Sequence, residues 1–441
     1  MSETLTLSEL RKAVTENAAA FRCRRRLQPA GGDGDKMFPP TFAGAVYAVE
    51  QRRVPGRDQP VTCVVLDTVQ SQANRMEQAL QDAVYADHFT IPMVAVDFSG
   101  SDPTGNLDKD REEGRLIDPV GTVTSLQVPH RLADAILRDS EHNGVAFRAS
   151  EVGRSLNTAS PLNATPILAL CPTALVFGMW DSTGPKGGLG PKFERAVVSE
   201  VVGIGAEFGI KTQSRIDPII SKTAGIVLYK DREGGWTLEE GQAAVEKGKP
   251  VKLGKDGKMS EANLGNVTPG FHKYARGPEG IDPLTGESAR EGRIAPGGVT
   301  IDYAEQVTTL SLICLRRLRF PVKDGAIDPA VDASARMVLA ALGLCAATLA
   351  FEAGLGLRSR CLLWPDAPME WELLDRPGEA PRSFTLTGEQ AVALLRDAVE
   401  AMDSRLPWRT EPITLKPSAK LLELVRRSQI EATKEDAGQG A

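Results

Sequence analysis

A strand, a helix and a second strand follow one another between residues 61 and 98, and this pattern constrains the fold most strongly. Residues 61–66 form a short run rich in β-branched residues, typical of a buried strand, and residues 91–98 form a second such run. Between them, Asp67 and Thr68 offer a helix N-cap, and apolar residues then recur at helical spacing. The pattern predicts a βαβ or split βαβ unit, and therefore an α+β fold.

Patterning along the rest of the chain predicts further elements. Residues 329–351 are alanine-rich and apolar on most sides, so we expect a helix largely buried in the core. Residues 100–128 are punctuated by glycine, aspartate and proline and are expected to form loops. Further strands are expected at 173–180, 225–228, 299–312 and 358–364, and further helices at 3–20, 388–402 and 416–427.

Residues 229–300 differ from the rest of the chain in composition. They hold 14 of the 42 glycines, five prolines and a lysine-rich stretch at 247–258. A loop of this length without structure of its own is uncommon inside a compact domain. We therefore expect an insertion that carries hairpins.

The distribution of charge matters more than its total. The net charge of −6 and the pI of about 5.5 argue weakly against nucleic acid as a partner. Residues 21–57, however, hold eight Lys/Arg and three Asp/Glu, a local excess of five positive charges. This segment, which we expect to be rich in loops, is either an anion-binding strip or an ordinary solvated face.

Cysteine usage and the N-terminal residues bear on the compartment. None of the six cysteines lies in a C-x-x-C pair, which favours buried free thiols in a reducing cytosol. The N-terminal residues lack a basic segment followed by an apolar one, so we expect no signal peptide. The longest apolar stretch, 337–350, is too short to span a bilayer. We expect a cytoplasmic protein without membrane contact.

Two glycine-rich segments invite a nucleotide-binding prediction, and both fail it. The loop at 181–192 has Leu189 where the Walker A pattern needs glycine, and the G-x-G at 203–205 is followed by Phe208 where the dinucleotide fingerprint needs glycine. No pair of histidines has metal-ligand spacing, so we expect neither a metal site nor a cofactor. The loop at 181–192 still suits contact with an RNA backbone, or it is a solvated hairpin tip.

Three aspartates each follow a predicted strand directly: Asp67, Asp97 and Asp181. Carboxylates gathered at strand ends could hold Mg²⁺ for phosphodiester cleavage. Aspartate is also a common helix cap and turn residue after a strand, and Asp67 already has a capping role to fill.

Binding of single-stranded RNA requires cations for phosphates and polar or aromatic groups for sugars and bases. Aromatic residues make up only 5% of the chain, so stacking on many aromatic platforms is not expected. The candidate RNA-facing residues are Arg24, Arg25, Arg26, Gln28, Lys36, Gln72, Asn74, Arg75, Lys186, Lys192, Lys273 and Arg276.

Four long blocks resemble one protein family. They are RLQPAGGDGDKMFPPTFAGAVYAVE (26–50), CVVLDTVQSQANRMEQAL (63–80), VFGMWDSTGPKGGLGPKFERAVVSEVVG (176–203) and GGVTIDYAEQVTTLSLICLRRLRFP (297–321). Together they resemble the RAMP-type backbone subunit of type I-G (formerly I-U) CRISPR effector complexes, the Cas-seven group. The resemblance extends from about residue 20 to residue 365 and is weaker beyond it.

The resemblance implies a modified RRM/ferredoxin-like palm with long insertions, likened to fingers and a thumb. The palm would comprise residues 20–228 and 297–365. The glycine- and lysine-rich insertion at 229–296 would be the thumb-like element. Residues 366–441 would form a helical extension whose tail, from Glu431, frays.

The resemblance also implies a function without catalysis. Copies of the chain would stack head to tail along CRISPR RNA and present the guide for pairing with target DNA. The implied partners are a Cas-five/six fusion subunit, a large subunit and a helicase-nuclease recruited later.

Two other functions stay open at the level of sequence. A metal-dependent ribonuclease of the same superfamily would use Asp67, Asp97 or Asp181, since type III relatives cut target RNA through a loop aspartate. A metabolic enzyme with an unrecognised phosphate site would bind a small phosphate ligand and no RNA.

Overall fold

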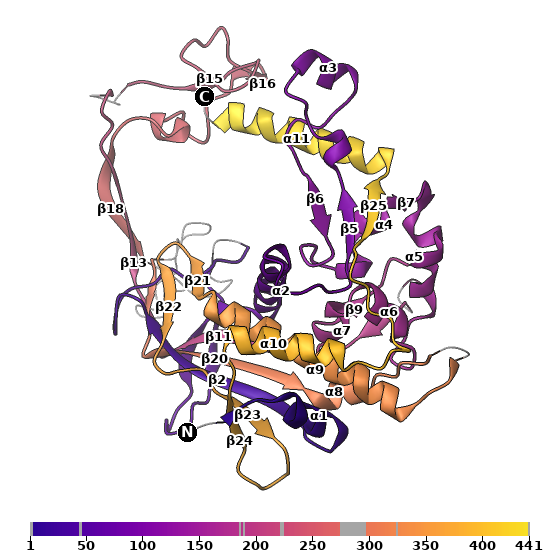
Figure 1. The fold of residues 1–441 in the computed structure, drawn as a ribbon. Helices are drawn as coiled ribbons and strands as arrows, with labels where there is room; N and C mark the ends of the chain where they lie inside the picture. Colours follow the sequence, from indigo (N-terminus) through magenta and orange to yellow (C-terminus); the bar gives the residue numbers. More distant parts are fainter. Residues whose placement is uncertain are drawn as a thin grey trace.

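The computed structural model describes residues 3–43, 46–184, 187, 190–220, 225–273, 297–322 and 325–439 (Figure 1). The fold is α+β, as the sequence predicted. Within these residues, one sheet has ten strands and another has five, and helices pack against both. Most of the helices and both sheets contribute side chains to one large apolar core.

The centre of the large sheet is a set of antiparallel neighbours in the order β22/β23, β2, β20, β11. Helix α2 lies in the chain between β2 and β11, and helix α9 between β20 and β22. The resulting βαββαβ order is compatible with the expected ferredoxin-like palm, and we call this unit the palm. Its elements are β2 (Ala20–Pro29), α2 (Val69–Tyr85), β11 (Val197–Ile204), β20 (Tyr303–Ser311), α9 (Pro329–Glu352), β22 (Cys361–Pro365) and β23 (Trp371–Leu374).

The predicted unit at 61–98 is correct in its first two elements and wrong in its last pairing. Strand β4 (Val61–Asp67) lies beside β11, and α2 follows it. Strand β5 (Val94–Asp97) does not return to that sheet, because the other edge of β4 is taken by β3 (Val49–Arg52). Instead it pairs in parallel with β25 (Ile413–Pro417) in the five-stranded sheet.

Helix α9 is the core helix that its composition predicted. It contacts α1 (Leu7–Thr15), α2, α10 (Gly388–Glu400) and β20, and Figure 1 shows it lying across the large sheet. Its length and mean hydropathy of 1.7 match those of a membrane span, but 78% of that apolar stretch is buried inside the protein. Such burial fits a core helix.

Three local predictions need correction. Residues 173–180 form a helical turn, α7 (Thr173–Val176), before β9 (Met179–Trp180), because a short apolar run does not distinguish a buried strand from a buried helix. Residues 225–228 form no strand. The basic segment expected as loop begins with β2, in which Arg22, Arg24 and Arg26 alternate with buried residues at the period of a strand.

The C-terminal region also departs from expectation. The tail predicted to fray from Glu431 continues helix α11 (Ala419–Gln439), since its Glu, Lys and Ala residues are good helix formers. The Gln429 side chain of α11 accepts a hydrogen bond from the Ile117 backbone N–H at 2.9 Å and donates one to the Asp118 carbonyl at 2.9 Å. These bonds fasten α11 to the segment that precedes β6 (Thr122–Thr124).

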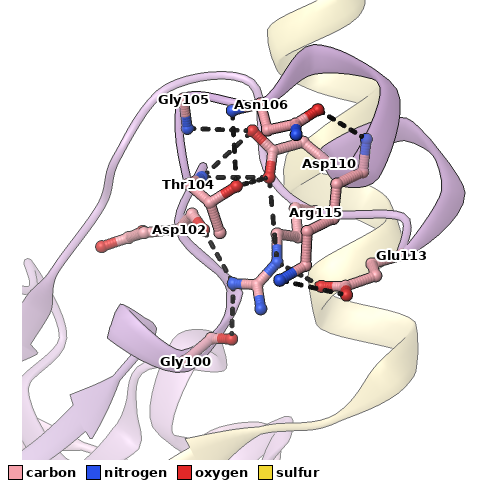
Figure 2. A network of polar contacts seen from close by, with 9 residues as sticks. Gly100, Asp102, Thr104, Gly105, Asn106, Asp110, Glu113 and Arg115 are labelled. Atoms are coloured by element: carbon pink, nitrogen blue, oxygen red, sulfur yellow. Dashed lines mark hydrogen bonds and ion pairs between the residues drawn. The ribbon is translucent and has the colours of Figure 1, made fainter.

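That segment was expected to be irregular. It nevertheless contains helix α3 (Leu107–Glu112) and is held together by a network of hydrogen bonds and ion pairs (Figure 2). The Asp110 carboxylate accepts hydrogen bonds from the Thr104 hydroxyl at 2.6 Å and from the Thr104 and Gly105 backbone N–H groups at 3.0 and 3.2 Å. The Thr104 hydroxyl bond holds the pKa of Asp110 below its usual range. Arg115 donates to the Asp102 carbonyl at 3.0 Å and closes the loop.

A two-stranded arm projects from the palm (Figure 1, left). It consists of β13 (Ile210–Arg215) paired with β18 (Val267–Lys273), and we call residues 216–266 its tip. The tip has buried residues of its own, Leu228, Ala243 and Met259. The predicted domain boundary between residues 228 and 229 falls inside the tip, and residues 274–296 of the predicted insertion lie outside the described residues.

The base of the tip is closed by Asp217. Its carboxylate accepts hydrogen bonds from the backbone N–H groups of Ile219, Ile220 and Gly265, at 3.0, 2.9 and 2.7 Å. These bonds, led by that from Ile219, lower the pKa of Asp217. The tip is thus joined to the arm at a defined point.

The cysteines predict a labelling pattern. All six are free and five are buried, while Cys314 is half-buried. Burial raises the pKa of Cys23 and Cys345 to about 12 and that of Cys361 to about 11, so these thiols carry little reactive thiolate at neutral pH. In the folded protein we expect iodoacetamide to modify Cys314 first, measured by peptide mass spectrometry. Equally fast labelling of all six would contradict this burial.

Candidate nucleic-acid interface

The arginines of β2 that point away from the helices are paired with carboxylates. Arg22 meets Glu372 at 2.7 Å, and Arg24 meets Glu305 at 2.5 Å. The hydrogen bond to Glu305 raises the pKa of Arg24. Because neighbouring strands supply these carboxylates, this face of the sheet carries less positive charge than its sequence suggests.

Arg26 shares that face and has two partners. Its guanidinium lies 4.1 Å from the centre of the Tyr303 ring and 3.6 Å from the Asp366 carboxylate. More than half of the Arg26 and Arg24 side chains is exposed. Both could exchange a carboxylate for an RNA phosphate, but only by giving up an existing ion pair.

Three other candidates point away from solvent. Arg25 is 9% exposed, and its guanidinium lies 4.9 Å from the centre of the Phe351 ring, where burial lowers its pKa. Gln28 is half-buried and Gln72 is buried. Arg25 and Gln72 are not available to RNA in this structure.

A cluster of cations that no carboxylate of the described residues pairs with lies where the arm leaves the palm. The Phe38 ring is within cation–π distance of the Lys36 ammonium, at 5.6 Å, and of the Arg360 guanidinium, at 4.7 Å. Arg358 donates to the Pro39 carbonyl at 3.1 Å. We call Lys36, Phe38, Arg358 and Arg360 the basic corner.

The position and charge of the basic corner suit contact with an RNA backbone. Lys36 also donates to the carbonyl of Ile210, the first residue of the arm, at 3.3 Å. In the described part of the chain, no ion pair within 4.0 Å involves Lys36, Arg358 or Arg360. Cations that no carboxylate neutralises are the side chains expected to bind phosphates.

Helix α2 begins beside the basic corner and is tied to it. Its N-cap Thr68 accepts from the Ser71 N–H at 3.2 Å. Arg75 donates from Nε to Asp67 at 2.9 Å and from its terminal nitrogen to the Leu357 carbonyl of β21 (Leu355–Arg358) at 3.3 Å. The positive end of the α2 dipole therefore faces the same region.

A buried polar network holds the start of α2 against the large sheet. Gln72 donates to Asp67 Oδ2 at 2.6 Å. Its carbonyl oxygen accepts from the Ser199 hydroxyl at 2.9 Å and from the Gln306 amide at 2.7 Å. These bonds join α2 to β11 and β20, so the Asp67 carboxylate is held in one orientation.

The remaining RNA candidates are scattered. Asn74 is exposed on α2. Lys192 lies 5.4 Å from the centre of the Trp180 ring, on the hairpin of β9 and β10 (Lys192–Phe193). Lys273 lies at the end of β18. Lys186 and Arg276 lie outside the described residues.

The three strand-end aspartates do not come together. Asp67 ends β4 of the large sheet, whereas Asp97 ends β5 of the other sheet and accepts from the Ser99 hydroxyl at 2.6 Å, which lowers its pKa. Asp181 pairs with Arg148 at 2.8 Å. Among the described residues, no cluster of three His, Cys, Asp or Glu side chains is placed to hold a metal ion.

Sequence reasoning missed Arg358 and Arg360. It assigned this stretch to a closing strand, whereas the structure forms a hairpin of β21 and β22 with Arg360 at its turn, at a φ of 59°. The R-S-R triplet at 358–360 was the available signal. The triplet contributes to a site only because the fold brings it close to Phe38, which lies more than 300 residues earlier in the chain.

Comparison with known proteins finds a family match for the first half of the chain. Residues 21–208 match the family model described as CRISPR-associated protein GSU0053 (Cas_GSU0053). No curated protein matches the chain. The matched span contains Lys36, Phe38, Asp67 and α2, and it ends before the arm begins. Over residues 21–208 the chain is therefore similar to a CRISPR-associated protein, which indicates a part in CRISPR defence.

Proposed function

We propose that this chain is a guide-RNA-binding backbone subunit of a type I-G CRISPR effector complex in the cytoplasm. The observation that carries the proposal is the basic corner. There, beside an aromatic ring and the start of a helix, three cations have no carboxylate partner in the described part of the chain. Lys36, Phe38 and Arg75 belong to the span that is similar to a CRISPR-associated protein.

In this proposal the protein holds the RNA backbone, and base pairing reads the sequence. Lys36, Arg358 and Arg360 bind phosphates, while Phe38 offers apolar surface to a sugar or base. Bases that face away from the protein pair with target DNA. No cofactor is required for this role.

We propose further copies of the chain as the main protein partners. The arm reaches from one copy to the next, in a head-to-tail contact that does not close on itself and therefore builds a filament. A Cas-five/six fusion subunit, a large subunit and a later helicase-nuclease complete the proposed assembly.

Neutralising the basic corner tests the proposal. The triple variant Lys36→Ala, Arg358→Ala, Arg360→Ala should lose about three phosphate contacts. The slope of log affinity against log salt, which is negative, should then become less steep by about two units. Fluorescence anisotropy with single-stranded RNA at several salt concentrations measures this slope.

A matched control separates the basic corner from net charge. Arg317, Arg382 and Arg427 are surface arginines, each paired with a glutamate at 2.6, 2.9 and 2.7 Å. Their triple alanine variant changes the net charge equally and should leave the slope nearly unchanged. An equal loss in both variants would mean that RNA affinity follows net charge alone.

We also propose that the chain does not cut RNA. RNA bound to the protein is expected to stay intact after incubation with Mg²⁺, measured by gel electrophoresis. Cleavage that disappears in an Asp→Ala variant at Asp67, Asp97 or Asp181 would contradict this and favour the ribonuclease function.

A further inference from the structure

The hairpin of β9 and β10 presents an aromatic ring and a cation side by side. Trp180 is 53% exposed, and the Lys192 ammonium lies 5.4 Å from the centre of its ring. The two residues face each other in the antiparallel register of the hairpin. In the part of the chain that the structure describes, no carboxylate forms an ion pair with Lys192. The pair therefore has the same composition as Lys36 and Phe38 in the basic corner.

The residue that follows Trp180 is turned inward instead. Asp181 is 2% exposed, and its Oδ2 lies 2.8 Å from Nη1 of Arg148, whose side chain is only 12% exposed. Among the described residues, no other group forms a hydrogen bond or an ion pair with the Arg148 guanidinium. The Asp181 carboxylate is therefore needed to offset the burial of this positive charge.

The described residues of the loop between β9 and β10 are folded closely around Asp181. Its backbone N–H donates to the Pro191 carbonyl at 2.9 Å. A Cβ atom at Gly184 would lie 2.5 Å from the Asp181 carboxylate, and one at Gly190 would overlap the Asp181 carbonyl oxygen. Asp181 and Pro191 each adjoin one member of the exposed pair in sequence. Fixing these two residues therefore fixes the direction in which the pair points.

The position and charge of the hairpin favour RNA over a protein as its ligand. In Figure 1, α2 lies between this hairpin and the hairpin of β21 and β22, which carries part of the basic corner. An RNA strand that leaves the basic corner across α2 would meet Trp180 and Lys192 next. A cation without a carboxylate partner, beside an exposed aromatic ring, is the combination that binds the backbone of single-stranded RNA.

We propose that Trp180 and Lys192 form a second RNA contact, and that Asp181 is the positioning residue that holds them outward through its ion pair with Arg148. The inference rests on the proposed RNA-binding function. Lys192 binds a phosphate, and Trp180 offers its ring to whichever sugar or base lies against it, so the contact is independent of sequence. Asp181 itself does not touch the RNA.

The experiment measures the affinity of the full chain for single-stranded RNA of mixed sequence by fluorescence anisotropy. The double variant Trp180→Ala, Lys192→Ala should bind about tenfold more weakly. Both side chains are exposed, so the variant should keep its fold, as checked by circular dichroism. Asp181→Asn should weaken binding by a similar factor, because it releases the hairpin. Added to the double variant, Asp181→Asn should have no further effect, since it acts through the two side chains already removed.

Asp332→Asn is the matched control for the loss of a buried ion pair. Asp332 and Arg336 of α9 lie 3.1 Å apart, and their side chains are 3% and 11% exposed. This variant should keep the affinity of the wild type for RNA. An equal loss of affinity in Asp332→Asn would mean that stability, and not the direction of the hairpin, explains the effect of Asp181→Asn, which overturns the positioning role.

The other outcomes separate this contact from the function on which it rests. Unchanged affinity of the double variant overturns the second contact and leaves RNA binding at the basic corner intact. The positioning role of Asp181 is overturned if Asp181→Asn binds as tightly as the wild type, or if it still loses affinity when added to the double variant. Absence of RNA binding by the wild type overturns this inference together with the proposed function.

Discussion

Removal of the tip is expected to abolish assembly along RNA and to leave the palm folded. In this variant, residues 216–266 are replaced by Asn-Gly, a two-residue turn that suits a hairpin and can join β13 to β18, whose last pair is Arg215 with Val267. The tip keeps its few buried residues within itself, so the core of the palm loses nothing. Electron microscopy and sedimentation with RNA and partner subunits measure the length of the particles.

The exposed surface of the tip explains the size of this effect. Ile216 is 91% exposed and Ile219 is 82% exposed, at the point where the arm meets the tip. Apolar side chains exposed to this degree are suited to burial against another molecule. The control replaces residues 376–380, an exposed loop between β23 and β24 (Arg382–Thr385), by the same dipeptide and should assemble normally. Full-length particles from the variant without its tip would show that the arm is not the connecting element.

Glu77→Gln is expected to lower the free energy of unfolding by about 3–5 kcal/mol. Arg131 donates to both Glu77 oxygens, at 2.7 and 2.6 Å, and to the Gly178 carbonyl at 2.9 Å. The two side chains are 8% and 2% exposed, so the substitution leaves a guanidinium buried without an anion. Urea unfolding followed by circular dichroism measures the change.

An exposed ion pair of the same length provides the comparison. Arg317 and Glu194 also lie 2.6 Å apart, but their side chains are 62% and 64% exposed. Glu194→Gln should cost about 1 kcal/mol or less, because water solvates the remaining arginine. Similar losses in the two variants would mean that burial does not set the strength of the Glu77–Arg131 pair.

The elements that sequence predicted well are those specified by local patterns. The β-branched run of β4, the N-cap of α2 and the long apolar run of α9 can each be recognised within one short stretch of sequence. The strand with which β5 pairs could not be predicted in this way. Its partner β25 lies more than 300 residues away, and no local pattern records that pairing.

The candidate site was harder to predict, for a related reason. The arginine run at 24–26 is conspicuous in sequence, yet Arg25 is buried and Glu305 and Asp366 pair with its neighbours. Lys36 was identified, but it is the hairpin of β21 and β22 that brings Arg360 to the Phe38 ring and Arg358 to the Pro39 carbonyl. The effective charge of a basic residue depends on partners that only the fold brings near.

The RNA content of the assembled protein tests the central claim most directly. The chain is expressed with its native CRISPR array and partner subunits and purified at a salt concentration low enough to keep phosphate contacts. The bound nucleic acid is then extracted and sequenced. We predict repeat-spacer RNA of uniform length in a particle with several copies of this chain. An assembled particle that carries no RNA would contradict the account.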